Sequence, residues 1–349
     1  MAIILCIGNK SLLIVVMVTA QLIINSVAMV WVVYEARRLG IASVGRCVAV
    51  AFCIADANCL FETTDDCFLL LGFSSLSVLG LIQLWCNENV SARVAVGWGI
   101  GGGLFALASP TCGFTWAILT IMAFRKNLKR LWICGAVAFL CVLPWMARNQ
   151  IVFGTFVPIK ANAGFEAWQA NVLDEDGVLD RSSTRPHPNV GGEEHRRQIR
   201  EIGEVAYCRQ LGAQFSTWVR TNPTEYLQKI FNRIERSTIA FQNTHFVSSH
   251  HWLWKGVLAG VHASPWLLLP IALIFPNYMD KRYWILVAWT TIYLIPYWLI
   301  SYVDRYGTPL VAIKALMVIM VIASIRRGTT QDYLELGKAW RRTSFGSQT

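Results

Sequence analysis

The sequence predicts an all-α polytopic membrane protein with about nine transmembrane helices and one extracytoplasmic, mainly helical segment. Hydrophobic residues form 55% of the 349 residues and charged residues 15%, whereas about a quarter of a typical soluble domain is charged. The apolar residues occur in runs of roughly twenty, the length that a helix needs to cross a bilayer. One long polar stretch, residues 150–251, divides these runs into two groups.

Seven apolar runs each predict a single spanning helix: residues 11–34, 45–60, 67–85, 131–145, 252–275, 283–302 and 309–325. An eighth run, 94–124, is too long for one upright helix. Ser109 and Pro110 lie in its middle, and proline lacks an N–H donor and disfavours helix in the residue before it. We therefore expect two short helices here. The glycines between residues 99 and 103 predict close helix packing rather than a phosphate-binding loop.

Basic residues predict the topology, because they gather in alternate loops between the predicted spans. These residues are Arg37, Arg38, Arg46, Arg93, Arg125, Lys126, Lys129, Arg130, Lys281, Arg282, Arg326 and Arg327. By the positive-inside rule their side is cytoplasmic. The chain then divides into an N-terminal transmembrane bundle of about six spans (1–149), an extracytoplasmic segment (150–251), C-terminal transmembrane helices (252–325) and a cytoplasmic tail (326–349). Nine alternating spans place Met1 outside, so we expect one further helix before it.

The net charge of +10 does not predict nucleic-acid binding, because the basic residues lie between apolar spans rather than on one soluble face. Nine of the ten cysteines lie in or beside apolar runs, which predicts packing residues rather than a disulfide or zinc framework. Within the polar segment, residues 150–189 are rich in Gly, Pro and Asn and are expected to form loops. Residues 193–241 are expected to be helical, with a break at Asn222 and Pro223.

Acidic residues just before a predicted span give the first candidate site. Glu62, Asp65 and Asp66 fall on the outer face, where ionisable groups near hydrocarbon are costly and therefore often functional. A carboxylate in this place can act as a general base, with Asp65 and then Asp66 as the candidates, or help to hold a divalent cation. The alternative is a solvated loop between helices. No cofactor beyond this cation is expected.

Basic and aromatic residues after the predicted span 131–145 give the second candidate site. Arg148 and Asn149 are expected to cap a membrane helix that ends at a Pro-Trp pair, and a guanidinium there suits bidentate phosphate binding. The candidates that follow suit stacking and hydrogen bonding to a sugar: Lys160, Asn162, Trp168 and Asn171. Interfacial anchoring in lipid would explain Arg148 and Trp168 equally well.

A third candidate site lies between the last two predicted spans, again on the outer side. It consists of Asp304, Arg305 and Tyr306, with the alternative that Arg305 serves only to pair with Asp304. Three histidines, at positions 245, 250 and 251, have no carboxylate at metal-ligand spacing, so no metal site is predicted from them.

Six patterns in this order resemble the GT-C superfamily of glycosyltransferases, and most closely the bacterial relatives of protein O-mannosyltransferases and lipid A aminoarabinose transferases. The patterns are ARRLG (36–40), TTDDCF (63–68), LFALASPT (104–111), LPWMARNQIVFGTFVPIKANAGFEAW (143–168), GEVAYCRQLGAQFSTWVRTNPTEYL (203–227) and DRYGTPL (304–310). Each pattern alone is weak, and the six in order cover most of the chain.

The resemblance implies transfer of a sugar from a polyprenyl-phosphate donor to a lipid, glycan or protein acceptor at the outer face of a bacterial inner membrane. It implies that Arg305 or Arg148 neutralises the donor phosphate and that a carboxylate acts as base. The chain differs from the family in two places. Ser109 stands where an Arg usually precedes the Pro, and nothing before Ser11 supplies the N-terminal span and first outer loop that carry the usual catalytic Asp.

Two other classes of function stay open at this stage. The chain can be a truncated, inactive relative that lacks its base, or a non-catalytic membrane protein such as a transporter component. Transport predicts charged residues inside the spans, and here the spans are nearly free of charge except at Asp56 and Lys314.

Overall fold

The computed structural model describes residues 10–60, 67–86, 90–179, 192–239 and 252–327. Across these ranges the chain is built from helices and contains no β-strand, so the predicted all-α class is confirmed. A single parallel bridge joins Val178 to Tyr302.

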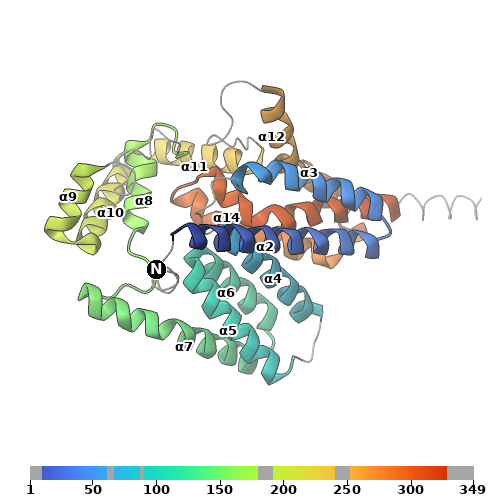
Figure 1. Cartoon of the computed structure of the whole chain (residues 1–349), viewed down its shortest axis with the longest axis horizontal. Helices are drawn as coiled ribbons and strands as arrows, with labels where there is room; N and C mark the ends of the chain where they lie inside the picture. Colours follow the sequence, from blue (N-terminus) through green and yellow to red (C-terminus); the bar gives the residue numbers. More distant parts are fainter. Residues whose placement is uncertain (1–9, 61–66, 87–89, 180–191, 240–251, 328–349) are drawn as a thin grey trace, which may run out of the picture.

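The helices fall into the three groups that the apolar and polar runs predict (Figure 1). The first group comprises α2 (Lys10–Arg38), α3 (Ala42–Leu60), α4 (Cys67–Cys86), α5 (Ala92–Ala108), α6 (Pro110–Phe124) and α7 (Leu128–Phe153). The polar segment contains α8 (Ala163–Trp168), the π-helix η1 (Gln169–Leu173), α9 (Glu193–Ile202), α10 (Glu204–Thr221) and α11 (Pro223–Thr238). The third group comprises α12 (Trp252–Leu267), α13 (Leu269–Ile274), the short η2 (Pro276–Tyr278), α14 (Lys281–Leu299) and the helical segment Asp304–Arg327, which begins as the 3₁₀-helix η3 (Asp304–Leu310).

The segment Asp304–Arg327 forms the centre of the bundle. Its side chains from Leu310 to Met317 are almost completely buried, and they belong to one apolar core with residues of α2, α3, α4 and α14. Lys314, in the middle of this segment, is also fully buried. In contrast, α7 lies at the edge of the bundle against α5 and exposes large apolar side chains such as Trp132 and Leu140 (Figure 1).

Two helices of the described chain, Leu128–Phe153 and Asp304–Arg327, are long and apolar enough to cross a membrane. Five further apolar helical stretches are shorter, each between 10 and 17 residues. The two long helices favour an association with a membrane, whereas the expected count of about nine spans is not confirmed and stays a prediction.

The break predicted inside residues 94–124 is present, because α5 ends at Ala108 and α6 begins at Pro110. The glycines before it permit close packing, as predicted. A Cβ atom on Gly103 would lie 2.4 Å from the Cβ of Cys141, and one on Gly99 would lie 2.7 Å from the carbonyl oxygen of Cys134. Both partners are residues of α7, so these two glycines allow α5 and α7 to pack closely.

Three expected boundaries were wrong. Residues 150–189 are not simply loop, because α8 and η1 lie within them. Residues 193–241 break at Gly203 as well as at Asn222, since Gly203 has a φ of +84°, a left-handed value that glycine adopts readily. The predicted span 131–145 does not end at its Pro-Trp pair, because α7 continues through Pro144 to Phe153. Its cap is Gly154, whose φ is +64° and whose N–H donates to the carbonyl of Gln150. The expected boundary after Asn149 therefore falls inside α7.

The basic turns predicted to be cytoplasmic lie together at one end of the bundle (Figure 1). Arg282, at the start of α14, donates to Glu35 near the end of α2 at 3.1 Å. Arg326, at the end of the last segment, donates to the carbonyl of Gly40 in the α2–α3 turn, also at 3.1 Å. The polar segment, with α8 to α11, lies at the opposite end (Figure 1).

Candidate functional site

A cavity of about 460 Å³ lies where the polar segment meets the ends of the apolar helices. The start of α6, the loop before α8, α8 itself, the end of α14 and η3 all contribute to its wall. We call it the first cavity, and its lining residues are Leu70, Ser109, Pro110, Thr111, Phe114, Lys160, Asn162, Ala163, Glu166, Pro296, Tyr297, Ile300, Ser301, Arg305 and Tyr306. It therefore joins Lys160, Asn162, Arg305 and Tyr306, which come from two of the three candidate sites in the sequence.

Glu166 is the carboxylate of this cavity, and it lies on α8 one helical turn after Asn162. Its side chain accepts hydrogen bonds from Asn162 Nδ2 at 3.2 Å and from the Ser301 hydroxyl at 3.5 Å. Burial raises the pKa of Glu166, while the positive charge of Arg305, the two hydrogen bonds and the charge of Lys160 act in the opposite direction. The cavity thus combines a base of raised pKa with two cations.

An aromatic wall faces these charges. The rings of Tyr297 and Tyr306 stack with centroids 4.3 Å apart, and the Arg305 guanidinium lies 5.5 Å from the centroid of the Tyr306 ring. A stacked pair of tyrosines presents an apolar surface with polar edges, which is a surface suited to a sugar ring.

A second cavity, of about 650 Å³, lies next to the first and shares Lys160 and Asn162 with it. Its walls come from the end of α7, the loop before α8, α9 and the start of α10. We call it the second cavity, and its lining residues are Trp145, Arg148, Asn149, Phe153, Ile159, Lys160, Ala161, Asn162, Phe165, Arg196, Ile199, Arg200, Glu204, Tyr207 and Cys208. Four of them are cationic and one is anionic, so this cavity favours anionic ligands.

The last turns of α7 hold the loop between the two cavities in place. Asn149 is buried and donates from Nδ2 to the carbonyls of Val157 at 3.0 Å and Ile159 at 3.3 Å. The indole of Trp145 donates to the same Ile159 carbonyl at 3.1 Å. Asn149 is therefore a positioning residue for Lys160. Arg148 donates to Asn149 at 3.0 Å and lies over the ring of Trp145.

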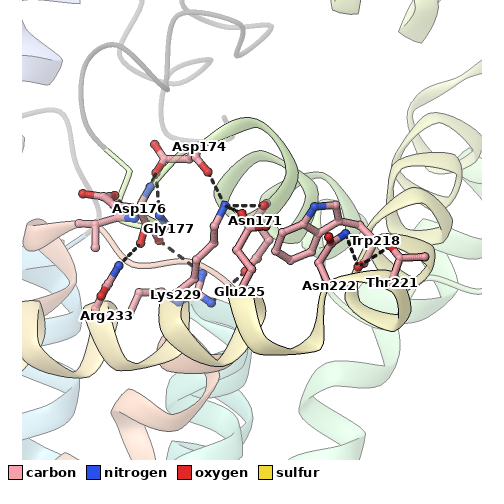
Figure 2. A network of polar contacts seen from close by, with 12 residues as sticks. Asn171, Asp174, Asp176, Gly177, Trp218, Thr221, Asn222, Glu225, Lys229 and Arg233 are labelled. Carbon is pink, nitrogen blue, oxygen red and sulfur yellow. Dashed lines mark hydrogen bonds and ion pairs between the residues drawn. The ribbon is translucent and has the colours of Figure 1, made fainter.

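Asn171 lies outside both cavities, in a buried network that ties η1 to α11. Figure 2 shows Lys229 and Arg233 pointing from α11 toward the loop that follows Asn171. Arg233 donates to the side-chain oxygen of Asn171 at 2.9 Å, and Asn171 Nδ2 donates to the carbonyl of Ile300 at 2.9 Å. Lys229 donates to the carbonyls of Asn171 and Asp174 at 2.8 and 2.6 Å. These contacts position the segment rather than leaving it available for a ligand.

Asp304 is also buried and belongs to the same framework. It accepts two hydrogen bonds from the guanidinium of Arg236 on α11, at 3.0 and 2.9 Å. This bidentate ion pair fixes the start of η3, and with it the neighbouring Arg305 at the cavity wall. Asp304 thus forms an ion pair with Arg236 of the polar segment. The sequence had suggested only Arg305 as its partner.

Trp168 packs beside an apolar cluster formed by Phe165, Tyr207, Cys208 and Leu211, and its ring lies 5.7 Å from that of His195. Burial raises the pKa of the Cys208 thiol to about 11, so this cysteine is protonated at neutral pH and unsuited to act as a nucleophile. Trp168 does not line either cavity.

Asp65 and Asp66, the candidates for the base, lie outside the described residues. Within the described ranges, no group of three His, Cys, Asp or Glu side chains could hold a metal ion. Five lining residues were not among those predicted from the sequence: Glu166, Tyr297, Ser301, Arg196 and Arg200. Glu166 lies in the ANAGFEAW stretch that carried part of the resemblance, and its spacing of four from Asn162 was the available signal.

Comparisons of the chain with models of known protein families, with curated proteins and with solved structures find no match. The fold and the described residues define an all-α protein with two helices that are long and apolar enough to cross a membrane, and with a charged cavity at one end of its bundle.

Proposed function

We propose that this protein is a membrane glycosyltransferase that moves a sugar from a polyprenyl-phosphate donor to an acceptor, and that the first cavity is its active site. The observation that supports this most is the presence of Glu166, Arg305 and Lys160 in one cavity. Sugar transfer from a lipid phosphate needs a base for the acceptor and positive charge for the leaving phosphate, and these residues supply both. The ordered resemblance to GT-C glycosyltransferases points to the same reaction.

In this reaction Glu166 removes the proton from an acceptor hydroxyl. The acceptor oxygen then forms a bond to the anomeric carbon of the sugar while the bond from that carbon to the phosphate oxygen breaks. The electron pair of the broken bond leaves with the polyprenyl phosphate, whose negative charge Arg305 and Lys160 neutralise. Burial favours Glu166 as a base, because a carboxylate of raised pKa accepts a proton more readily than an ordinary one.

The second cavity then receives the acceptor. It adjoins the first cavity through Lys160 and Asn162, and its basic lining suits an acceptor that carries negative charge. Arg148 belongs to this acceptor side, whereas Arg305 belongs to the donor side. The two arginines, which the sequence offered as alternatives for one phosphate, would therefore serve different substrates.

The membrane setting of this proposal has about nine spans, a cytoplasmic C-terminus and an extracytoplasmic segment 150–251, in a bacterial inner membrane. The exposed apolar surface of α7 and the grouping of the basic turns at one end of the bundle support it. Membrane lipids then surround the apolar helices of the protein. Both cavities lie at the end of the bundle opposite the basic turns. A divalent cation at Asp65 and Asp66 would add to the charge available for the phosphate.

Transfer of a radiolabelled sugar from polyprenyl-phosphate donors to endogenous acceptors in membrane vesicles tests the proposal. Glu166→Gln removes the base and should lower transfer by about 100-fold or more, while Glu166→Asp should restore part of it. Glu201→Gln, an exposed change on α9, is the matched control and should leave transfer unchanged. Equal transfer by Glu166→Gln and the control would contradict the proposal.

A transport function is the second candidate, because Lys314 and His262 are both fully buried among the apolar helices. Ionisable groups in that position often belong to ion pathways. Neither residue lines the two cavities described above, which favours the enzymatic proposal. Uptake of protons or sugars into vesicles that is abolished by Lys314→Met, with no sugar transfer by the unmodified protein, would favour transport instead.

A further inference from the structure

Helix α11 presents three different faces. Its inner face is basic and buried, with Lys229 at 3% exposure and Arg233 at 0%. Both side chains donate to backbone carbonyls of the loop after η1, Lys229 to Asp174 and Arg233 to Gly177, as Figure 2 shows. The charged face of α11 is thus the face that packs on the protein.

The outer surface of α11 divides into an apolar flank and a polar flank. Because a helix turns about 100° per residue, residues four apart lie within about 40° of each other, whereas adjacent residues lie about 100° apart. Leu227 and Phe231 form the apolar flank, with 54% and 62% of their surfaces exposed. Gln228 and Asn232 form the polar flank, where they bond to each other at 3.0 Å. Large apolar side chains that are exposed next to each other on one flank mark an interaction surface for a protein or a membrane.

The position of α11 indicates what covers this flank. The hydroxyl of Tyr226, near its beginning, donates to the carbonyl of Leu299 at the end of α14, at 2.9 Å. Near its other end, Ser237 accepts from the indole of Trp298 at 2.7 Å, and Arg236 binds Asp304. Most of the length of α11 therefore lies across the ends of α14 and the last apolar segment. Leu299 is itself 45% exposed, so this end of α14 also carries an exposed apolar side chain.

We propose that α11 is an interfacial helix whose apolar flank lies in the lipid at the boundary between headgroups and acyl chains. An amphipathic helix in the plane of the interface, with one flank in the hydrocarbon and one in water, has this distribution of side chains. The proposal rests on the membrane setting proposed above, and it assigns the bilayer, rather than a protein partner, as the occupant of the flank made by Leu227 and Phe231.

The inner face of α11 gives this contact a consequence for the site. Lys229 and Arg233 hold the loop after η1, and η1 follows the helix α8 that carries Glu166. Arg236 holds Asp304, next to Arg305. The helix that contacts the lipid is therefore also the helix that positions both sides of the first cavity. Through α11, the site is held at a fixed distance from the bilayer surface.

Photo-crosslinking of the full-length protein in phosphatidylethanolamine–phosphatidylglycerol liposomes tests this inference. The photoreactive p-benzoylphenylalanine replaces Phe231 in one variant and Gln228, on the polar flank, in a second. A third variant carries it in place of Phe139, an exposed apolar residue of α7, and reports on the membrane setting alone. Mass spectrometry of the irradiated protein then identifies whether each position has added a lipid or another protein chain.

We expect lipid adducts at positions 231 and 139, and at least fivefold fewer at position 228. Adducts at 139 without adducts at 231 would overturn the interfacial assignment of α11 and leave the membrane setting intact. Crosslinks from 231 to another copy of the chain would also overturn it, by showing a protein interface. An absence of lipid adducts at both 231 and 139 would contradict the membrane setting itself.

Discussion

Burial of the Glu166 carboxylate gives this single residue a measurable effect on stability as well as a proposed role in catalysis. Its raised pKa means that the folded protein binds this proton more tightly than the unfolded chain does. Below the pKa of the unfolded chain, Glu166 is protonated in both states. As the pH rises above that value, the unfolded chain loses its proton first, so folding becomes less favourable until the raised folded pKa is also passed.

Glu166→Gln should therefore stabilise the protein more at pH 7 than at pH 4, because glutamine keeps hydrogen-bonding atoms and removes the cost of a buried charge. Thermal unfolding in detergent at the two pH values measures this difference. Glu201→Gln, which changes an exposed carboxylate on α9, should show no comparable dependence. An equal shift of the melting temperature at both pH values for Glu166→Gln would show that the burial of this carboxylate has no energetic effect.

Arg233 is a second residue whose role follows from its burial. It is fully buried, and burial lowers the pKa of its guanidinium to about 10. It donates to Asn171 and to the carbonyls of Gly177 and Ile300. Arg233→Met would remove these three hydrogen bonds from a buried network, so the free energy of unfolding should fall by roughly 2–4 kcal/mol. Arg220→Met, an exposed change on α10, should cost less than about 0.5 kcal/mol in the same chemical denaturation experiment. Similar values for both variants would contradict the network.

At the level of residues, the structure brings together part of the set of site residues that the sequence predicted. Lys160, Asn162, Arg305 and Tyr306 do line one cavity. Asn171 and Asp304 instead hold the framework, because their partners Arg233 and Arg236 come from a helix more than sixty positions away along the chain in each case. Such long-range pairs leave no local pattern in the sequence. The residues that line the cavity and those that hold the framework could therefore not be distinguished from the sequence.

Helix boundaries are predictable from the sequence where the length of an apolar run and the position of a proline or glycine agree. The Ser109–Pro110 break and the turn at Asn222 are at their predicted places, since proline acts through its own backbone. Pro144 did not end α7, because a helix inside an apolar bundle tolerates proline and a stronger stop lies at Gly154. The left-handed Gly203 was missed because a single glycine in a helical pattern is a weak signal.

The close contact between α5 and α7 allows a matched test on one helix. Gly103→Ala would place a Cβ atom 2.4 Å from that of Cys141, whereas Gly97 has no neighbouring atom within 4 Å. Overpacking should make Gly103→Ala destabilising by about 1–3 kcal/mol. Gly97→Ala should be neutral or slightly stabilising, because alanine favours helix over glycine. Melting temperatures of the two purified variants decide this. A Gly103→Ala protein as stable as Gly97→Ala would mean that α5 and α7 are not in close contact.

For the whole molecule, the distribution of charge is the feature that connects sequence and structure most directly. The basic turns, which are separated by up to about 290 residues, lie together at one end, and the polar segment lies at the other. In the proposed membrane setting, the positive-inside rule predicts that the basic end is cytoplasmic. The order of packing among the helices was not predictable, because lengths and charges of loops say nothing about which apolar faces meet.

Reporter fusions test this orientation. A chain truncated after Asn222 and fused to alkaline phosphatase should be active in bacterial cells, because the phosphatase folds only outside the cytoplasm. A chain truncated after Arg327 and fused to green fluorescent protein should fluoresce, because that reporter needs the cytoplasm. The exchanged pair of fusions should give neither signal. The opposite pattern of signals would reverse the topology and place both cavities on the cytoplasmic side.

Binding of undecaprenyl phosphate to the protein in lipid nanodiscs tests the central claim most directly, since this carrier is common to many polyprenyl-phosphate donors. Native mass spectrometry across a series of lipid concentrations gives the affinity. The unmodified protein should bind, and Arg305→Ala should bind about 10–100-fold more weakly, because it loses a charged contact with the phosphate. Arg220→Ala, on the surface of α10, should bind like the unmodified protein. Equal affinity of the Arg305→Ala and Arg220→Ala proteins would contradict the assignment of the first cavity to the donor phosphate.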